Sequence, residues 1–127
     1  MSFDWEDFST IADALCTNSD LRALGEARYR TAISRAYYAA FHQAISFAEN
    51  DTAAFTRGRT GQDHKNVQDY FQASSDRNRR RIATNLARLH DNRKMADYDD
   101  TIIGSVQSLA QSSVAVARNI INTLPGL

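Results

Sequence analysis

The apolar residues of this sequence recur every three or four positions along almost the whole chain, and the alternation typical of strands is nearly absent. We expect a first helix from Ser2, whose hydroxyl can cap it, to about Cys16, where TNSD interrupts the pattern. A second helix is expected over roughly residues 25–49. Its apolar stripe reads Tyr29, Ile33, Ala36/Tyr37, Ala40/Phe41, Ala44 and Phe47/Ala48. The stripe predicts a buried seam, and its alanines predict the close approach of a neighbouring helix.

The middle of the chain predicts a loop and two further helices. Residues 50–62, NDTAAFTRGRTGQ, form the longest irregular stretch, and the glycines and arginines in it are typical of a mobile basic loop. Asp63 is expected to cap a third helix that runs to about Ala73, and Asp76 to cap a fourth. The inner face of the fourth helix would carry Ile82, Leu86 and Leu89.

The last helix has the clearest periodicity. ADYDDT precedes it, and these acids would suit the positive end of the helix that follows. Its apolar positions are Ile102/Ile103, Val106, Leu109/Ala110, Ser113/Val114, Ala117, Ile120/Ile121 and Leu124, before the chain ends in PGL. With no internal repeat or linker, the pattern predicts one all-α domain over residues 1–127, a single antiparallel bundle of about five helices.

The amino-acid composition agrees with this fold and indicates the cellular compartment. Of 127 residues, 43% are hydrophobic and only five are Gly and one Pro, which argues against disorder and against a turn-rich β fold. The single Cys16 is expected to fill the core in a reducing compartment. No apolar run approaches the roughly 18 residues that span a membrane, and the acidic start MSFDWEDF does not resemble a secretory signal. These features predict a cytoplasmic protein.

The net charge of zero hides an uneven distribution. Residues 1–56 carry four basic and eight acidic side chains, and residues 95–127 carry one basic and three acidic. Residues 57–94 carry ten basic and four acidic side chains, so an anionic ligand would meet the middle of the chain.

One stretch, RYRTAISRAYYAAFHQA at residues 28–44, combines the core pattern with polar side chains. Arg28, Arg35, His42 and Glu49 are seven residues apart and share one helix face, because seven residues return to within about 20° of the start. Arg35 and His42 would lie about 10 Å apart along the axis, where they could flank a phosphate. The alternative is a solvated stripe opposite the apolar seam, with the tyrosines packed in the core.

Three segments resemble the HEPN family of small helical bundles, whose name refers to nucleotide binding in higher eukaryotes and prokaryotes. YRTAISRAYYAAFHQA resembles the signature of the second HEPN helix, GQDHKNVQDYF resembles the third helix of one subgroup, and LHDNRKMADYDD resembles the loop before its last helix. The resemblance implies an HEPN-like bundle, a homodimer, and a role with RNA or a nucleotide. HEPN domains include ribonucleases, toxin components and non-catalytic partners, often of a nucleotidyltransferase.

Many HEPN ribonucleases carry an Arg, four to six residues and then a His just before the last helix, and two such motifs meet across the dimer. This pair suits metal-independent cleavage, in which the 2′-hydroxyl of RNA attacks the adjacent phosphate, His moves protons and Arg stabilises the developing charge. Here Arg93 is followed at those spacings by Tyr98, Asp99 and Asp100. A tyrosine is only about 0.1% ionised at pH 7, so Tyr98 starts roughly a thousandfold behind a histidine as a base.

The resemblance therefore implies candidate residues but leaves the activity open. The candidate catalytic residues are Arg93, Tyr98, His42 and Arg35, with Asp97 and Tyr38 as cleft or structural support. In the structural alternative, Asp97 pairs with Arg35 or Arg93, and Tyr98 lies in the core under the last helix. The chain offers no His/Cys cluster with metal-ligand spacing and only scattered acids, so we expect no metal and no other cofactor.

The basic middle supplies candidates for contact with RNA phosphates. These are Arg57, Arg59, His64, Arg77, Arg80, Arg81 and Arg88, which could form one positive field. Arg59 and His64 have the spacing of the nuclease motif, as do Arg35 and His42, but both pairs lie away from the motif's usual place. His64 and His90 could instead simply face solvent.

The function that we favour from the sequence is a protein that binds or acts on RNA or a nucleotide, as part of a toxin–antitoxin or defence system in a bacterium. The replacement of the usual His by Tyr98 favours weak catalysis or none. The first alternative is an active metal-independent endoribonuclease that uses Arg93 and Tyr98 with Arg35 and His42. The second is a structural dimerisation module paired with a nucleotidyltransferase.

Overall fold

The computed structural model describes residues 3–127, and in that part of the chain it contains five α-helices, two short 3₁₀ helices and no strand. The elements are α1 (Glu6–Thr17), η1 (Ser19–Leu24), α2 (Glu26–Asp51), α3 (Gln62–Gln72), α4 (Arg77–Tyr98), α5 (Val106–Thr123) and η2 (Leu124–Gly126). The predicted all-α bundle of about five helices is confirmed. Within the same residues, no helix combines the length and apolar character needed to cross a bilayer.

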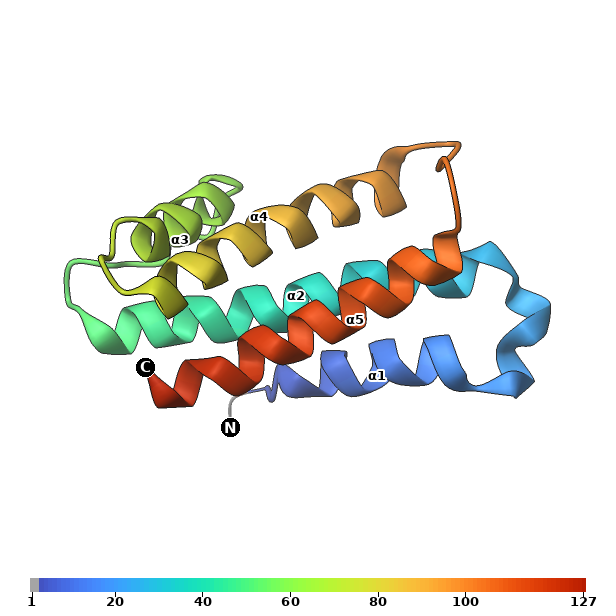
Figure 1. Cartoon of the computed structure of the whole chain (residues 1–127), viewed down its shortest axis with the longest axis horizontal. Helices are drawn as coiled ribbons and strands as arrows, with labels where there is room; N and C mark the ends of the chain where they lie inside the picture. The colour runs from blue at the N-terminus through green and yellow to red at the C-terminus, as the bar shows by residue number, and fades with distance from the viewer. Residues whose placement is uncertain (1–2) are drawn as a thin grey trace.

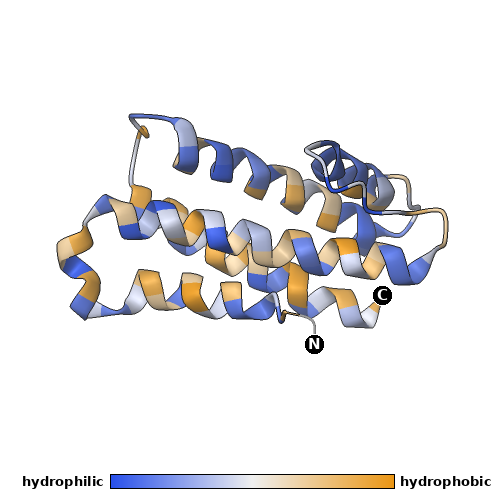
Figure 2. Ribbon diagram, turned by 180° about the vertical axis from the view of Figure 1, so that it is seen from behind, coloured by the Kyte–Doolittle hydropathy of each residue, from blue (hydrophilic) through white to orange (hydrophobic). Residues whose placement is uncertain are grey.

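The long helix α2 is the centre of the bundle and packs against each of the other four α-helices. It pairs with α5, while α1 lies along one side of this pair and α4 along the other (Figure 1). The shorter α3 packs mainly on α4, and the two chain ends lie toward the same end of the bundle (Figure 1). The ribbons of α3 and α4 are mostly hydrophilic (Figure 2), so the polar side of the molecule is the one built from these two helices.

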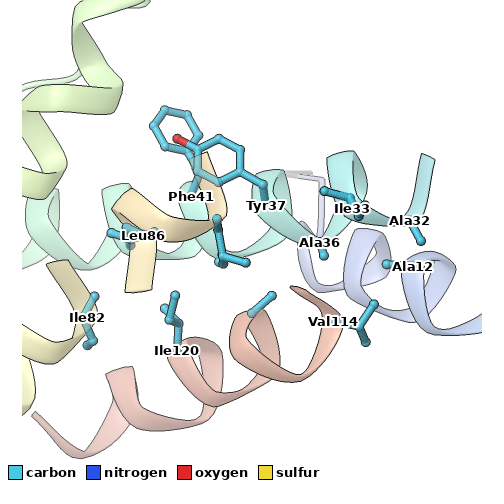
Figure 3. Close-up of a cluster of buried hydrophobic side chains, with 14 of the residues drawn as sticks. Ala12, Ala32, Ile33, Ala36, Tyr37, Phe41, Ile82, Leu86, Val114 and Ile120 are labelled. Atoms are coloured by element: carbon cyan, nitrogen blue, oxygen red, sulfur yellow. The ribbon is translucent and has the colours of Figure 1, made fainter. Parts of the chain in front are cut away.

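Small side chains allow the helices around α2 to approach closely. Ala36 and Ala40 of α2, Ala12 of α1 and Ala117 of α5 are all at most 1% exposed. Larger side chains of the same buried cluster come from α2, α4 and α5, among them Ile33, Tyr37, Leu86 and Ile120 (Figure 3). The predicted seam of α2 is therefore buried as expected, and its alanines do face close neighbours.

The start of the first helix differs from the prediction. Ser2 lies outside the described residues, and α1 begins at Glu6, whose N–H donates to Asp4 Oδ1 at 3.0 Å. TNSD does break the helix, since Asn18 caps the 3₁₀ helix that follows by accepting the Asp20 N–H at 2.9 Å. Gly25 then takes a φ of 59°, which only glycine adopts easily, and this turn directs the chain into α2.

The two predicted aspartate caps have different outcomes. Asp76 caps α4 as expected, because its Oδ1 accepts the Asn78 N–H at 3.3 Å. The expectation for Asp63 is wrong, since α3 already begins at Gln62. The Asp63 carboxylate instead accepts the backbone N–H groups of Gly58 and Arg59, each at 2.8 Å, and so ties the preceding loop to α3.

The boundary between the last two helices also differs. The helix α4 continues through the predicted interruption to Tyr98, and α5 begins only at Val106, where Ser105 caps it and accepts the Ser108 N–H. Ile103 therefore lies in the connection and is 98% exposed rather than on the inner face. No acid lies in the first turn of α5, so the expected role of the ADYDDT acids there is wrong.

Arg30 of α2 fixes the C-terminal end of α4. Its guanidinium donates to the carbonyl oxygens of Ala96 at 3.0 Å and Asp99 at 2.6 Å, with longer contacts to those of Met95 and Asp100. Its Nε also pairs with Glu26 at 2.7 Å. The last carbonyls of a helix have no partner within the helix and carry partial negative charge, so this arginine satisfies them and holds α4 against α2.

We predict that Arg30→Met lowers the free energy of unfolding by about 1.5–3 kcal/mol, the range for hydrogen bonds to charged groups. Urea denaturation of the two proteins measures the difference. The control is Arg118→Met, an exposed position of α5, which should change stability by at most about 0.5 kcal/mol. An equal effect of the two substitutions would contradict the role given to Arg30.

Candidate functional site

Arg93 of α4 is buried between α2 and α4, with only 9% of its surface exposed. Its guanidinium carbon lies 5.4 Å from the ring centre of Tyr38 and 5.9 Å from those of Tyr37 and Tyr98. Arginine cations are attracted to aromatic faces at such distances. The side chain that the resemblance makes the main catalytic candidate is therefore enclosed by tyrosines.

A short polar network connects Arg93 to Arg35 across the two helices. Arg93 Nη1 lies 3.5 Å from Asp97 Oδ2, which accepts the Ser34 hydroxyl at 3.3 Å. The same hydroxyl oxygen accepts Arg35 Nη2 at 3.2 Å. Asp97 thus pairs with Arg93 rather than Arg35, and the carboxylate supplies the countercharge that a buried guanidinium needs.

Tyr98 stands at the last residue of α4 and is 75% exposed. The structural alternative that placed it in the core under the last helix is wrong, because the side chain is exposed rather than covered by α5. One face of the ring covers the Arg93 guanidinium. Its exposed remainder is open to a ligand or to another protein.

Tyr38 is the side chain around which the predicted cleft residues gather. The guanidinium carbon of Arg35 lies 5.2 Å from its ring centre, and the imidazole of His42 lies 6.2 Å from it, centre to centre. The residues are neighbours, but they do not share one hollow. Arg35 and Asp97 line a hollow of about 380 Å³ between α2 and α4, whereas Tyr38 and His42 line a separate cavity of about 750 Å³.

The polar face of α2 is covered by other parts of the chain. Arg28 donates to the carbonyl of Asn18 at 2.9 Å, Arg35 stacks on Phe8 at 4.8 Å, and His42 stacks on Trp5 at 3.6 Å. Glu49 completes the line by pairing with Arg57 at 3.0 Å. The interpretation of this face as a solvated stripe is therefore wrong, because η1, the start of α1 and the loop after α2 all pack on it.

His42 is held as a neutral imidazole. Burial against Trp5, with the nearby charges of Arg57 and His64, lowers the pKa of His42 to about 4. Its Nδ1 is buried and has no hydrogen-bond partner. At pH 7 the ring is uncharged, so it can accept or donate one hydrogen bond but carries no charge for a phosphate.

The other two histidines stack on each other between α3 and α4. The rings of His64 and His90 lie 4.6 Å apart and nearly parallel, and the hydroxyl of Tyr37 hydrogen-bonds to His64 Nδ1. Phe41 stacks on the outer face of His64 at 4.4 Å. The expectation that His64 and His90 face solvent is wrong, since both are half-buried and join α3 and α4 to the aromatic side of α2.

The residues expected to contact RNA occupy two places rather than one field. Arg57, Arg59 and His64 line the 750 Å³ cavity between α2, the loop at residues 52–61 and α3. On α4, Arg77, Arg81 and Arg88 share a face within about 40° and span about 16 Å, with Arg80 about 60° from Arg77 around the helix. Arg88 faces α5, where its Nη2 reaches Ser112 Oγ at 3.3 Å.

Sequence reasoning missed three residues that shape this region. Trp5 covers His42, Ser34 joins the two arginines, and Arg30 holds the end of α4. The three aromatic residues of FDWEDF were a signal for the first, because such a cluster needs a partner surface. Nothing in the local pattern singles out Ser34 or Arg30, whose partners lie more than 60 residues away.

Comparison of the chain with models of protein families, with curated proteins and with solved structures finds no match. The resemblance to HEPN domains therefore remains a prediction. In residues 3–127, no three His, Cys, Asp or Glu side chains come together as metal ligands would.

We predict that the protein loses stability as the pH falls from about 6.5 toward 5, because its histidines resist protonation in the folded state. Burial is the main reason that the pKa of His90 falls to about 4 and that of His64 falls below 6.5, and nearby Arg93 adds to both shifts. The unfolded chain binds these protons near pH 6.5, so the stability is complete above that value and declines below it. Urea denaturation between pH 7.5 and 5 measures the decline.

The substitution His90→Gln should flatten this pH dependence, because it removes one of the protons that unfolding takes up. A matched control adds an exposed histidine by Gln107→His on α5, which should leave the slope as it is in the unaltered protein. A slope that is the same in all three proteins would show that the buried histidines do not govern it.

Proposed function

We propose that this chain is a HEPN-type helical module that binds RNA or a nucleotide and cleaves RNA weakly or not at all. The observation that carries this proposal is the burial of Arg93, which leaves 9% of the residue exposed. An arginine that stabilises a phosphorane-like transition state must reach the phosphate with its guanidinium. Here that group is stacked among tyrosines and paired with Asp97, so it supports the fold.

The side chains that could transfer protons also argue against efficient cleavage of RNA. Tyr98 is exposed, and phenols are in general poor bases at neutral pH. His42 is neutral at pH 7, yet its lowered pKa of about 4 makes it a weaker base than an ordinary histidine. His42 lines the 750 Å³ cavity and Arg93 does not, so the two do not face one phosphate there.

Exposed arginines favour binding. Arg77, Arg80 and Arg81 of α4 are exposed, and among the described residues no carboxylate pairs with them. Neutralisation of RNA phosphates by such side chains releases counterions, so the binding they provide weakens as salt rises. The exposed aromatic side chain of Tyr98 could add stacking on a base.

The setting of this function comes from the resemblance. We propose a homodimer in the bacterial cytoplasm, as a component of a toxin–antitoxin or defence system, with a nucleotidyltransferase as its partner protein. A second function, metal-independent endoribonuclease, is favoured by one observation, which is that the exposed Tyr98 lies directly over the Arg93 guanidinium. In a homodimer that buries this face, the second copy would place its own side chains beside Tyr98 and Arg93.

We predict that the purified protein binds a fluorescently labelled single-stranded RNA, with an affinity that falls as salt rises. The double substitution Arg77→Gln/Arg81→Gln should weaken binding and reduce the slope of log K against log salt by about 0.7 for each phosphate that the variant no longer neutralises. Fluorescence anisotropy over a series of salt concentrations gives both quantities.

The matched control is Lys65→Gln on α3, a lysine that is already paired with Asp69 at 3.0 Å. This substitution removes a positive charge that is already paired within the protein. The slope of log K against log salt should therefore stay unchanged. If RNA is not retained, or if the slope is the same for the double variant, the proposed RNA-binding face on α4 is wrong.

A further inference from the structure

The cavity between α2, the loop at residues 52–61 and α3 has the size of a small-molecule site. Its volume of about 750 Å³ lies within the range of 300–1,000 Å³ that is usual for ligand pockets. Such a cavity is too small for a folded nucleic acid but suits a ligand of nucleotide size. None of the exposed arginines of α4 lines it.

Arg59 at the mouth of the cavity has a conformation that the chain must enforce. Its φ is 59°, and among residues 3–127 no other residue except glycine has a positive φ. The buried Asp63, 4% exposed, enforces it by accepting the N–H groups of Gly58 and Arg59. A strained non-glycine residue that neighbours hold in place is a recurrent feature of binding sites.

One of the two arginines that line the cavity is free to bind an anion. Glu49 and Arg57 neutralise each other in an ion pair at 3.0 Å, and the Asp63 carboxylate is used by two backbone N–H groups. The guanidinium of Arg59 is exposed and has no hydrogen-bond or ion-pair partner among the described residues. Its planar fork of donors matches the oxygens of a phosphate.

The inner wall of the cavity is aromatic. Tyr38, Phe41 and His42 line it from α2, and His64 lines it from α3 with its ring stacked on Phe41. Apolar and aromatic side chains are the usual lining of ligand pockets, so this wall offers apolar contact to a nucleobase.

We propose that this cavity binds a mononucleotide, with the phosphate at Arg59 and the base against the aromatic wall. The inference deepens the proposed function by assigning the nucleotide to a site of its own, apart from the RNA-binding face of α4. This arrangement accounts for the positive φ of Arg59. In that conformation its guanidinium can hold the phosphate while the base of the nucleotide enters the cavity.

Isothermal titration of the purified protein with adenosine monophosphate, adenosine and inorganic phosphate tests the proposal. Adenosine monophosphate should bind at least about tenfold more tightly than either of its parts, because only it engages both the guanidinium and the wall. Binding of adenosine as tight as that of the monophosphate would overturn the role of Arg59. Failure of all three to bind at millimolar concentration would overturn the site itself.

Arg59→Gly gives the sharper test. Glycine takes the same φ without strain, so the variant should melt at the same temperature or higher and yet bind adenosine monophosphate at least about tenfold more weakly. Arg118→Gly, at an exposed position inside α5, should lower the melting temperature and leave mononucleotide binding unchanged. Unaltered binding by Arg59→Gly would contradict the proposal.

The two proposals fail separately in these measurements. If RNA binds with its expected salt dependence while adenosine monophosphate does not bind, the face on α4 stands and the cavity is not a nucleotide site. If adenosine monophosphate binds but RNA does not, the cavity stands and the protein is a nucleotide-binding module without the RNA-binding face.

Discussion

The burial of the Arg93 guanidinium is the constraint on which the arrangement of α2 and α4 depends. A charge taken out of water is costly unless other groups compensate for it, and here Asp97 supplies the countercharge while tyrosine faces enclose the cation. These partners come from both helices, so they fix how α4 sits on α2. Arg30 adds to the same joint by satisfying the carbonyls at the end of α4. The exposure of Tyr98 follows, because it is the next turn of a helix held in this position.

The local features of the fold could be predicted from the sequence, and the long-range features could not. The helical period located all five α-helices, and the cap at Asp76 was predicted because capping depends on neighbours two residues away. Ile103 was misplaced because an apolar residue looks the same in a pattern whether it begins a helix or ends a loop. The stack of His64 on His90 joins two helices, and no spacing along one chain indicates it.

The candidate site shows the same division. The ion pair of Arg93 and Asp97 was one of two pairings that the sequence offered, since residues four apart on a helix are neighbours. The cavity at Arg59 was not predicted, because it depends on Asp63 holding the loop rather than capping α3. The buried Arg93 therefore has a structural role, whereas the arginines without a partner, Arg59 and those of α4, lie at the surface. This division is the structural basis of the proposal that the protein binds RNA phosphates rather than cleaving at them.

The central claim is that this protein binds RNA without cleaving it efficiently, and incubation of an excess of protein with end-labelled structured RNA in EDTA tests it most directly. The account predicts that the RNA stays full length on a denaturing gel while a native gel shows it retained by the protein. Cleavage that persists in EDTA and is abolished in a folded Arg93→Lys variant would contradict the account. It would show that Arg93 acts on the phosphate and that the enclosed guanidinium becomes accessible during the reaction.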